Sequence, residues 1–387
     1  LGGHMMKKID NLTTIILFAV FLLTLGIGGW MLRDQSFSEN ENRYLQQKPQ
    51  ISAASILSGE FEETFQNYQD DQFPFRNSWI TLKTASKLAL FSKDLNGVYL
   101  GKDGYLIEKI SEEDADRELF TANLQTIKEF CQRLPEGISK SVILVPTTAA
   151  IMDRKLPTGA RPFDETSFAE EAAEQLKNLN YVDLYAAFKG EKGSQIYYKT
   201  DHHWTTEGAR LAYGAWRRKM GKSDASLKEL KKEVLSSDFQ GTLYSKVLWD
   251  DGTRDQVTAY IGSAQENWHV IADNKDIGGI YQKKYVNEKD KYAVFFGGNY
   301  GRLEIKTGKK TGRNLLIIKD SFANAFAPFA AEDFDQVCMV DLRYFSGNLE
   351  AYLKENHITD LLVLYSMSDM TKDKNISVLQ NGGDILS

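Results

Sequence analysis

Strand-like and helix-like segments alternate along the chain from about residue 120 to residue 365. The strand-like segments are residues 142–146, 181–185, 315–318, 337–340 and 361–365. The first of them is an unbroken apolar run of the kind buried on both faces of a parallel sheet. The helix-like segments, with apolar residues at helical spacing, are residues 121–134, 168–179, 208–220 and 349–356. This alternation predicts an α/β fold with a parallel sheet flanked by helices.

Residues 33–95 have a different pattern, which is polar with aromatic residues at helical spacing. Phe61, Phe65 and Tyr68 recur at i, i+4 and i+7, which predicts an amphipathic helix. A second helix-like run follows at 79–91. We therefore expect a helical linker region ahead of the α/β domain.

A second departure from the alternation lies at residues 221–310, which are polar and rich in turns. Short β-like pieces occur there, at 256–261 and 292–296. We interpret the segment as a β-rich insertion that covers or shapes the functional site. A hairpin is also expected ahead of the first buried strand, over residues 98–107.

One run near the N-terminus has the length and composition of a membrane span. Residues 15–32 carry no charge over 18 positions, close to the minimum for one crossing. Lys7 and Lys8 precede it, which places the N-terminus in the cytoplasm and the rest of the chain outside. We expect a single-pass anchor in the cell membrane with an extracytoplasmic C-terminal domain. A cleaved signal peptide is the alternative, disfavoured by the length of the run and by the lack of a clear small-x-small site.

The expected organisation has four parts, and the first residues resemble the remnant of an expression tag. The parts are residues 1–11, tag remnant and cytoplasmic N-terminus; 12–32, transmembrane anchor; 33–95, helical linker; and 96–387, an α/β catalytic domain with its insertion at about 221–310.

Composition excludes some classes of function. The net charge is −6 and no basic cluster is evident, so nucleic-acid binding is not expected. The two cysteines, Cys131 and Cys338, form no disulfide framework and no metal-ligand cluster. No glycine-rich phosphate loop follows a strand, and we expect no cofactor.

Two stretches carry residues suited to proton transfer and nucleophilic attack. Asp201 and His203 lie in the segment 199–208, directly before a helix-like run, and an aspartate beside a histidine can fix its tautomer and stabilise its cation. Ser321 follows an apolar strand and precedes a helix-like segment, where free backbone N–H groups can stabilise an oxyanion. A helix-capping role for His203 or Ser321 is the structural alternative for each residue.

These two stretches resemble the bacterial family named after the DHHW tetrapeptide, which stands here at residues 201–204. That family is similar to the alginate O-acetylation proteins and, more distantly, to SGNH-type serine esterases. The resemblance covers the chain from about Arg43 onward and implies an SGNH-hydrolase-like core. It also implies that Asp201 orients His203, the base, and that Ser321 is the nucleophile. The family's serine block usually reads Gly-Asp-Ser, whereas this chain has Lys319 in the first position.

Four further residues are candidates for binding the substrate or stabilising the oxyanion: Gly298, Asn299, Asn324 and Arg343. A tight turn at the glycines and a core ion pair for the arginine are the structural alternatives. A metal site at Asp201, His202 and His203 is a further alternative, but we expect no metal because the other histidines have no ligand spacing.

The resemblance implies O-acetyl transfer onto a cell-surface or secreted polysaccharide through an acyl-enzyme. It also implies a partner that supplies acetyl groups, an integral membrane-bound O-acyltransferase. The same serine chemistry would serve an esterase that removes acetyl groups, and a non-catalytic polysaccharide-binding assembly protein is the alternative from another class.

Overall fold

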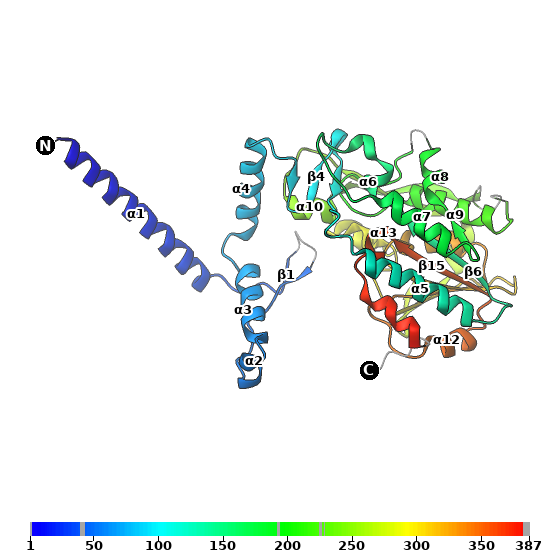
Figure 1. Ribbon diagram of the computed structural model, residues 1–387. Helices are drawn as coiled ribbons and strands as arrows, with labels where there is room; N and C mark the ends of the chain where they lie inside the picture. The colour runs from blue at the N-terminus through cyan, green and yellow to red at the C-terminus, as the bar shows by residue number, and fades with distance from the viewer. Residues whose placement is uncertain (1, 39–42, 192–193, 224–226, 228, 382–387) are drawn as a thin grey trace. The chain divides into compact units, whose positions relative to one another are not determined.

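The computed structural model describes residues 2–38, 43–191, 194–223, 227 and 229–381 (Figure 1). Leu1, part of the expected tag remnant, lies outside them. The chain divides into two compact units: residues 1–91 with Val247–Trp249, and residues 92–246 with 250–387.

The first unit is mainly helical. Its elements are α1 (Gly2–Met31), β1 (Phe37–Ser38), β2 (Arg43–Tyr44), α2 (Ala53–Leu57), α3 (Glu60–Asp71) and α4 (Arg76–Ala89). Within α1, the window Leu12–Gly29 has a mean hydropathy of 2.3 and is long and apolar enough to cross a membrane, the one such helix in the part of the chain described. One N-terminal helix could therefore act as a membrane anchor.

The predicted helices of the linker region match α3 and α4. On α3, the rings of Phe61 and Phe65 stack with centroids 5.6 Å apart, as their i, i+4 spacing requires. The helix ends at Asp71, and Pro74 lies in the turn that follows, where its ring cannot interrupt a helical hydrogen bond.

The second unit is built on an eight-stranded sheet in the order β11-β10-β12-β14-β13-β15-β6-β7. The strands are β6 (Ser139–Val145), β7 (Asn180–Val182), β10 (His269–Ala272), β11 (Lys275–Gly278), β12 (Arg302–Lys306), β13 (Asn314–Lys319), β14 (Gln336–Val340) and β15 (Asp360–Ser366). The five strands from β14 to β7 run parallel, whereas the pairs β14–β12, β12–β10 and β10–β11 are each antiparallel. The sheet is thus mixed, and not parallel throughout as the sequence predicted.

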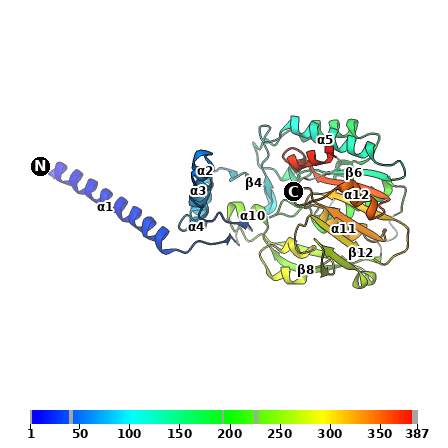
Figure 2. The ribbon, with the colours of Figure 1, turned by 90° about the horizontal axis from the view of Figure 1, so that it is seen from below.

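Helices cover both faces of this sheet, as Figures 1 and 2 show. They are α5 (Arg117–Arg133), α7 (Glu165–Gln175), α8 (Leu184–Lys189), α9 (Thr206–Lys219), α11 (Ala323–Ala330) and α12 (Leu349–Glu355). Alternate strand residues face opposite layers: Leu316 and Ile318 pack with residues of α5, α7 and α12, whereas Leu315 and Ile317 pack with residues of α9 and α11. Burial on both faces explains why residues 315–318 of β13 form an unbroken apolar run.

Smaller elements complete the unit. They are β3 (Asp94–Leu95), β4 (Val98–Leu100), β5 (Leu106–Glu108), β8 (Lys231–Phe239), β9 (Asp255–Ile261), α6 (Thr148–Ile151), α10 (Thr242–Val247) and α13 (Met367–Met370). The hairpin expected over 98–107 is formed by β4 and β5, with β3 alongside. Strands β8 and β9 form a separate two-stranded sheet.

Three details differ from the sequence-based expectation. The segment 221–310 supplies β8 and β9, but it also supplies three strands, β10 to β12, that extend the main sheet. Residues 292–296 are not a strand, because Lys291–Val294 forms a 3₁₀ helix capped by Asp290. The strand expected at 181–185 ends early because the Asp183 carboxylate accepts hydrogen bonds from the first backbone N–H groups of α8.

Candidate functional site

The DHHW stretch is a tight loop held closed at its base. Tyr197 and Trp204 form an antiparallel β-bridge, and the Thr205 hydroxyl accepts a hydrogen bond from the backbone N–H of Gly208 to cap α9. Trp204 is fully buried, and its indole N–H donates to the backbone carbonyl of Phe322 over 3.0 Å. That bond ties the loop directly to the serine turn, 118 residues away in the sequence.

The serine turn is shaped by Asp320. Its carboxylate accepts hydrogen bonds from the backbone N–H of Phe322 at 2.9 Å and from that of Ser366 at 2.6 Å. These bonds hold the chain where β13 gives way to α11, so that Ser321 stands at the carboxyl end of the strand. Burial, together with the charge of Asp369, raises the pKa of Asp320 to about 7, although these two hydrogen bonds act in the opposite direction.

Asp201, His203 and Ser321 form one continuous hydrogen-bonded chain. The Asp201 Oδ1 to His203 Nδ1 distance is 2.6 Å, and the His203 Nε2 to Ser321 Oγ distance is 2.7 Å. The structure therefore brings together the three residues that the sequence singled out. A histidine whose Nδ1 faces a carboxylate presents Nε2 to the hydroxyl as a proton acceptor.

His203 is enclosed by aromatic rings. Tyr292 stacks on it with centroids 3.9 Å apart and an interplanar angle of 9°, and the ring of His202 lies at the same centroid distance. Burial, together with a charge on His202, lowers the pKa of His203 to about 4, although Asp201 acts in the opposite direction. His203 is accordingly neutral near pH 7, the state in which Nε2 can accept a proton.

The Asp201 carboxylate is only 2% exposed, and four donors satisfy it. Its Oδ1 accepts from the backbone N–H and the Nδ1 of His203, and its Oδ2 accepts from the backbone N–H and the hydroxyl of Thr242. Burial alone would raise its pKa, but the neighbouring histidines and these donors lower it, so the group stays ionised. The Asp201 carboxylate packs directly against the backbone of Gly241, which only glycine permits, because a Cβ atom at residue 241 would lie 2.2 Å from Oδ2.

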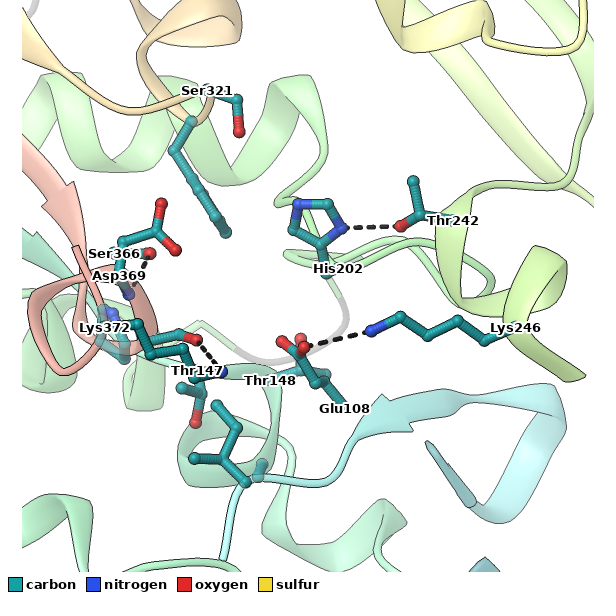
Figure 3. Close-up of a pocket in the computed structure, with 15 residues that line it drawn as sticks. Glu108, Thr147, Thr148, His202, Thr242, Lys246, Ser321, Ser366, Asp369 and Lys372 are labelled. Atoms are coloured by element: carbon teal, nitrogen blue, oxygen red, sulfur yellow. Dashed lines mark hydrogen bonds and ion pairs between the residues drawn. The ribbon is translucent and has the colours of Figure 1, made fainter. Parts of the chain in front are cut away.

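Ser321 opens onto a cavity of about 340 Å³, shown in Figure 3. The residues that line it are Glu108, Ile110, Pro146, Thr147, Thr148, Ala149, His202, Thr242, Lys246, Ser321, Phe322, Ser366, Ser368, Asp369 and Lys372. Several of them follow the carboxyl ends of the parallel strands β6, β13 and β15. Ligands bind at that edge in open α/β sheets, so the cavity has the expected location of a substrate site.

The other predicted site residues lie around Lys319 and not among those that line the cavity. Lys319 is 2% exposed, and its ammonium donates to the side-chain oxygens of Asn299 and Asn324 at 2.8 and 3.0 Å. It also lies 3.5 Å from a carboxylate oxygen of Asp341, which Arg343 binds through two nitrogens. The lysine that replaces the family's glycine therefore holds a buried polar cluster beside the serine turn.

Gly298 adopts a positive φ of 133° in the loop that carries Asn299, a conformation that favours glycine. This agrees with a tight loop at that place. A contact of Gly298, Asn299, Asn324 or Arg343 with substrate stays a prediction.

Sequence reasoning missed the residues of α10 and α13 that complete the site. Thr242 supports Asp201, and Asp369 lines the cavity, yet neither belongs to a recognisable motif. The Gly241-Thr242 pair predicts only the start of a helix, and such a local pattern does not indicate that the helix lies beside Asp201.

Asp201, His202 and His203 could also hold a metal ion, since one ligand atom from each lies within 4.8 Å of the others. Hydrogen bonds within the protein already use both oxygens of Asp201 and both ring nitrogens of His203. A metal ion would have to replace the bond to Ser321 or the bond to Asp201. The donor set therefore fits proton transfer better than metal ligation.

The fold and this site define a mixed α/β protein in which a serine at the end of a central strand is hydrogen-bonded, through a histidine, to an aspartate. The family described as DHHW protein matches residues 172–340, a range that includes both the DHHW loop and Ser321. A DHHW family protein from Eubacterium siraeum superposes with a TM-score of 0.64 at 26% identity, over 76% of this chain and 97% of that one. The resemblance expected from the sequence is therefore confirmed.

Three further proteins are similar to this chain. Bacillus cereus PatB1 superposes with a TM-score of 0.58 at 20% identity, over 72% of this chain and 98% of that one, which shows a shared fold. A Pseudomonas fluorescens protein named "Probable alginate O-acetylase AlgJ" is 27% identical over 207 residues, 51% of this chain and 48% of that protein. The AlgJ of Azotobacter vinelandii is 26% identical over 224 residues, 54% and 52% of the two chains. The chain spans about half the length of the curated relatives it matches.

Proposed function

We propose that this protein is an extracytoplasmic O-acetyltransferase that acetylates a cell-surface or secreted polysaccharide through an acyl-enzyme on Ser321. The observation that carries the proposal is the chain of hydrogen bonds of 2.6 and 2.7 Å from Asp201 through His203 to Ser321, at the wall of a cavity. The curated relatives named as alginate O-acetylases support the choice of reaction. An SGNH-hydrolase-like core belongs to the same proposal.

In the first half-reaction, Ser321 Oγ attacks the carbonyl carbon of an acetyl donor and His203 Nε2 takes the hydroxyl proton. The bond to the leaving group then breaks, and His203 returns the proton to that group. Asp201 stays ionised and stabilises the histidine cation formed in between. The backbone N–H of Ser321 has no hydrogen-bond partner among the described residues, so it is a candidate donor to the oxyanion.

In the second half-reaction, a sugar hydroxyl attacks the acetyl carbonyl of the acyl-enzyme. His203 Nε2 takes the proton of that hydroxyl, and the Ser321–acetyl bond breaks. The serine oxygen recovers the proton from His203, which restores the starting state. An esterase differs only in that water takes the place of the sugar hydroxyl.

The apolar helix α1 would keep the catalytic unit at the outer face of the cell membrane as a single-pass anchor. Such an anchor suits an acetyl donor that is itself delivered through the membrane. We therefore include a membrane-bound O-acyltransferase as the donor partner in the proposal.

The test uses the full chain in detergent with 4-nitrophenyl acetate as donor and an oligosaccharide as acceptor. Wild type should release nitrophenol and yield acetylated sugar, and Ser321→Ala and His203→Ala should each lose at least about 100-fold of that turnover. Ser377→Ala, which removes an exposed serine, is the matched control and should keep wild-type turnover. Nitrophenol release without acetylated sugar would support the esterase. Equal turnover in all four proteins would overturn the serine mechanism.

A further inference from the structure

A second histidine stands beside the base and lines the cavity. The ring of His202 lies 3.9 Å, centroid to centroid, from that of His203, and its Nδ1 lies 2.7 Å from the hydroxyl oxygen of Thr242. The other ring nitrogen, Nε2, has no hydrogen-bond partner among the described residues. Figure 3 shows that nitrogen on the side of the ring away from Thr242, toward Ser321.

The hydrogen bonds around Asp201 decide which nitrogen of His202 carries the proton. The Thr242 hydroxyl has one hydrogen and two neighbours that could accept it, Asp201 Oδ2 at 3.0 Å and His202 Nδ1 at 2.7 Å. A buried carboxylate is the stronger acceptor, because its charge reinforces the bond. The hydroxyl therefore donates to Asp201 and accepts from His202 Nδ1–H. Neutral His202 consequently presents Nε2 to the cavity as a bare acceptor.

A second bare acceptor lines the same cavity. The Asp369 carboxylate accepts no hydrogen bond from any described residue, although Asp369 lies in the partly buried first turn of α13. In Figure 3 its two oxygens point into the space that Ser321 and His202 also border. Both acceptors face the cavity, so a ligand that is complementary to them supplies hydrogen-bond donors at these two places.

The charges on the cavity wall favour hydroxyl donors over ammonium donors. The Lys246 Nζ lies 3.3 Å from a carboxylate oxygen of Glu108, and the ammonium of Lys372, a second cation on the wall, donates to the Ser368 hydroxyl. The lining thus contains two carboxyl side chains and two ammonium groups, so its formal charges balance. A neutral polyol meets both requirements, since it donates hydrogen bonds without bringing a charge.

We propose that His202 and Asp369 form an acceptor subsite that binds neighbouring hydroxyl groups of a neutral sugar and so directs another hydroxyl of that sugar to the acetyl group on Ser321. The inference rests on the proposed transferase function and adds the residues that recognise the acceptor. The proton of the reacting hydroxyl still goes to His203 Nε2, whereas His202 and Asp369 accept hydrogen bonds without proton transfer. Binding sugar at this place favours transfer over hydrolysis of the acyl-enzyme.

The first experiment measures how the acyl-enzyme partitions. Full-chain protein is acetylated with 4-nitrophenyl acetate in the presence of cellotetraose, and the ratio of acetylated sugar to free acetate is measured. This ratio does not depend on how fast the acyl-enzyme forms. His202→Phe keeps an aromatic ring but removes the acceptor, and Asp369→Asn converts one acceptor oxygen into a donor. Each should lower the ratio about tenfold, as expected for one lost hydrogen bond.

The matched control is His269→Phe, which removes an exposed imidazole on β10 and should leave the ratio at the wild-type value. A wild-type ratio in both His202→Phe and Asp369→Asn, with active wild type, overturns the subsite but not the transferase. A cellotetraose ratio below that of an equally long uronic-acid oligosaccharide overturns the preference for a neutral sugar.

The second experiment does not require activity. In Ser321→Ala protein, ¹⁵N NMR of the histidine rings should show His202 protonated on Nδ1, and added cellotetraose should shift its Nε2 resonance. Protonation on Nε2 without sugar, or no shift with sugar, contradicts the subsite. If wild type forms no acyl-enzyme, the transferase proposal fails on its own, and these spectra still decide whether the cavity binds sugar.

Discussion

Gly241 offers a sharp test of the geometry around Asp201. In Gly241→Ala the new Cβ would lie 2.2 Å from Oδ2, 2.4 Å from Cβ and 2.6 Å from Cγ of Asp201. The first of these is about an ångström closer than the 3.4 Å at which ordinary contact begins. All three atoms belong to one side chain, so the carboxylate must move, and the 2.6 Å bond to His203 Nδ1 breaks or lengthens.

A displacement of about 1 Å in a catalytic group typically costs about 100-fold in rate, or about 2.7 kcal/mol of transition-state stabilisation. Overpacking at a buried position should also lower the free energy of unfolding by about 1–3 kcal/mol. The assay is kcat/KM for 4-nitrophenyl acetate, with thermal unfolding to confirm that the variant is folded. Gly137→Ala is the control, because a Cβ there meets nothing within 4 Å. Equal kcat/KM in both variants, with both folded, would refute the role assigned to Asp201.

Three further predictions concern acid, metal and the buried lysine. The pKa of His203 is lowered from its ordinary value of 6.5 to about 4, so the base stays neutral as the pH falls below 6.5. The acid limb of the kcat/KM profile should therefore have its midpoint well below pH 6.5. A midpoint at or above pH 6.5 would contradict the role of His203 as the base. Dialysis against EDTA should leave turnover unchanged, whereas loss of activity that Zn²⁺ restores would favour a metal at Asp201, His202 and His203. Lys319→Ala should lower the free energy of unfolding, measured in urea, by about 2 kcal/mol, because Asn299 and Asn324 lose their buried donor. A change of less than about 0.5 kcal/mol would contradict a structural role for the lysine.

The central strands could be predicted because burial on both faces leaves a local signature. Residues 315–318 of β13 form a fully buried apolar run, and the strand leads directly to the serine turn. The pairing of Ser321 with His203 followed from residue chemistry and the family resemblance. The structure adds that Trp204 links the DHHW loop to the serine turn, because its indole N–H donates a hydrogen bond to the backbone carbonyl of Phe322.

The parts that could not be predicted depend on contacts between distant residues. Strand β12 joins the sheet antiparallel to β14, and its alternation of buried and more exposed residues predicts a strand but does not identify this partner. Thr242 reaches Asp201 across 41 residues of sequence. Lys319 can be buried because Asp341 and two asparagines surround its ammonium, and a single lysine in the sequence gives no sign of such partners.

The most direct test of the account is the mass of the protein during turnover. Full-chain protein mixed with 4-nitrophenyl acetate and quenched in acid should gain about 42 Da, one acetyl group in place of one hydrogen, and peptide mapping should place it on Ser321. Ser321→Ala should show no such gain, while Ser377→Ala should match wild type. An acetyl group on another residue, or rapid turnover without any adduct on Ser321 under the same quench, would contradict the proposed acyl-enzyme.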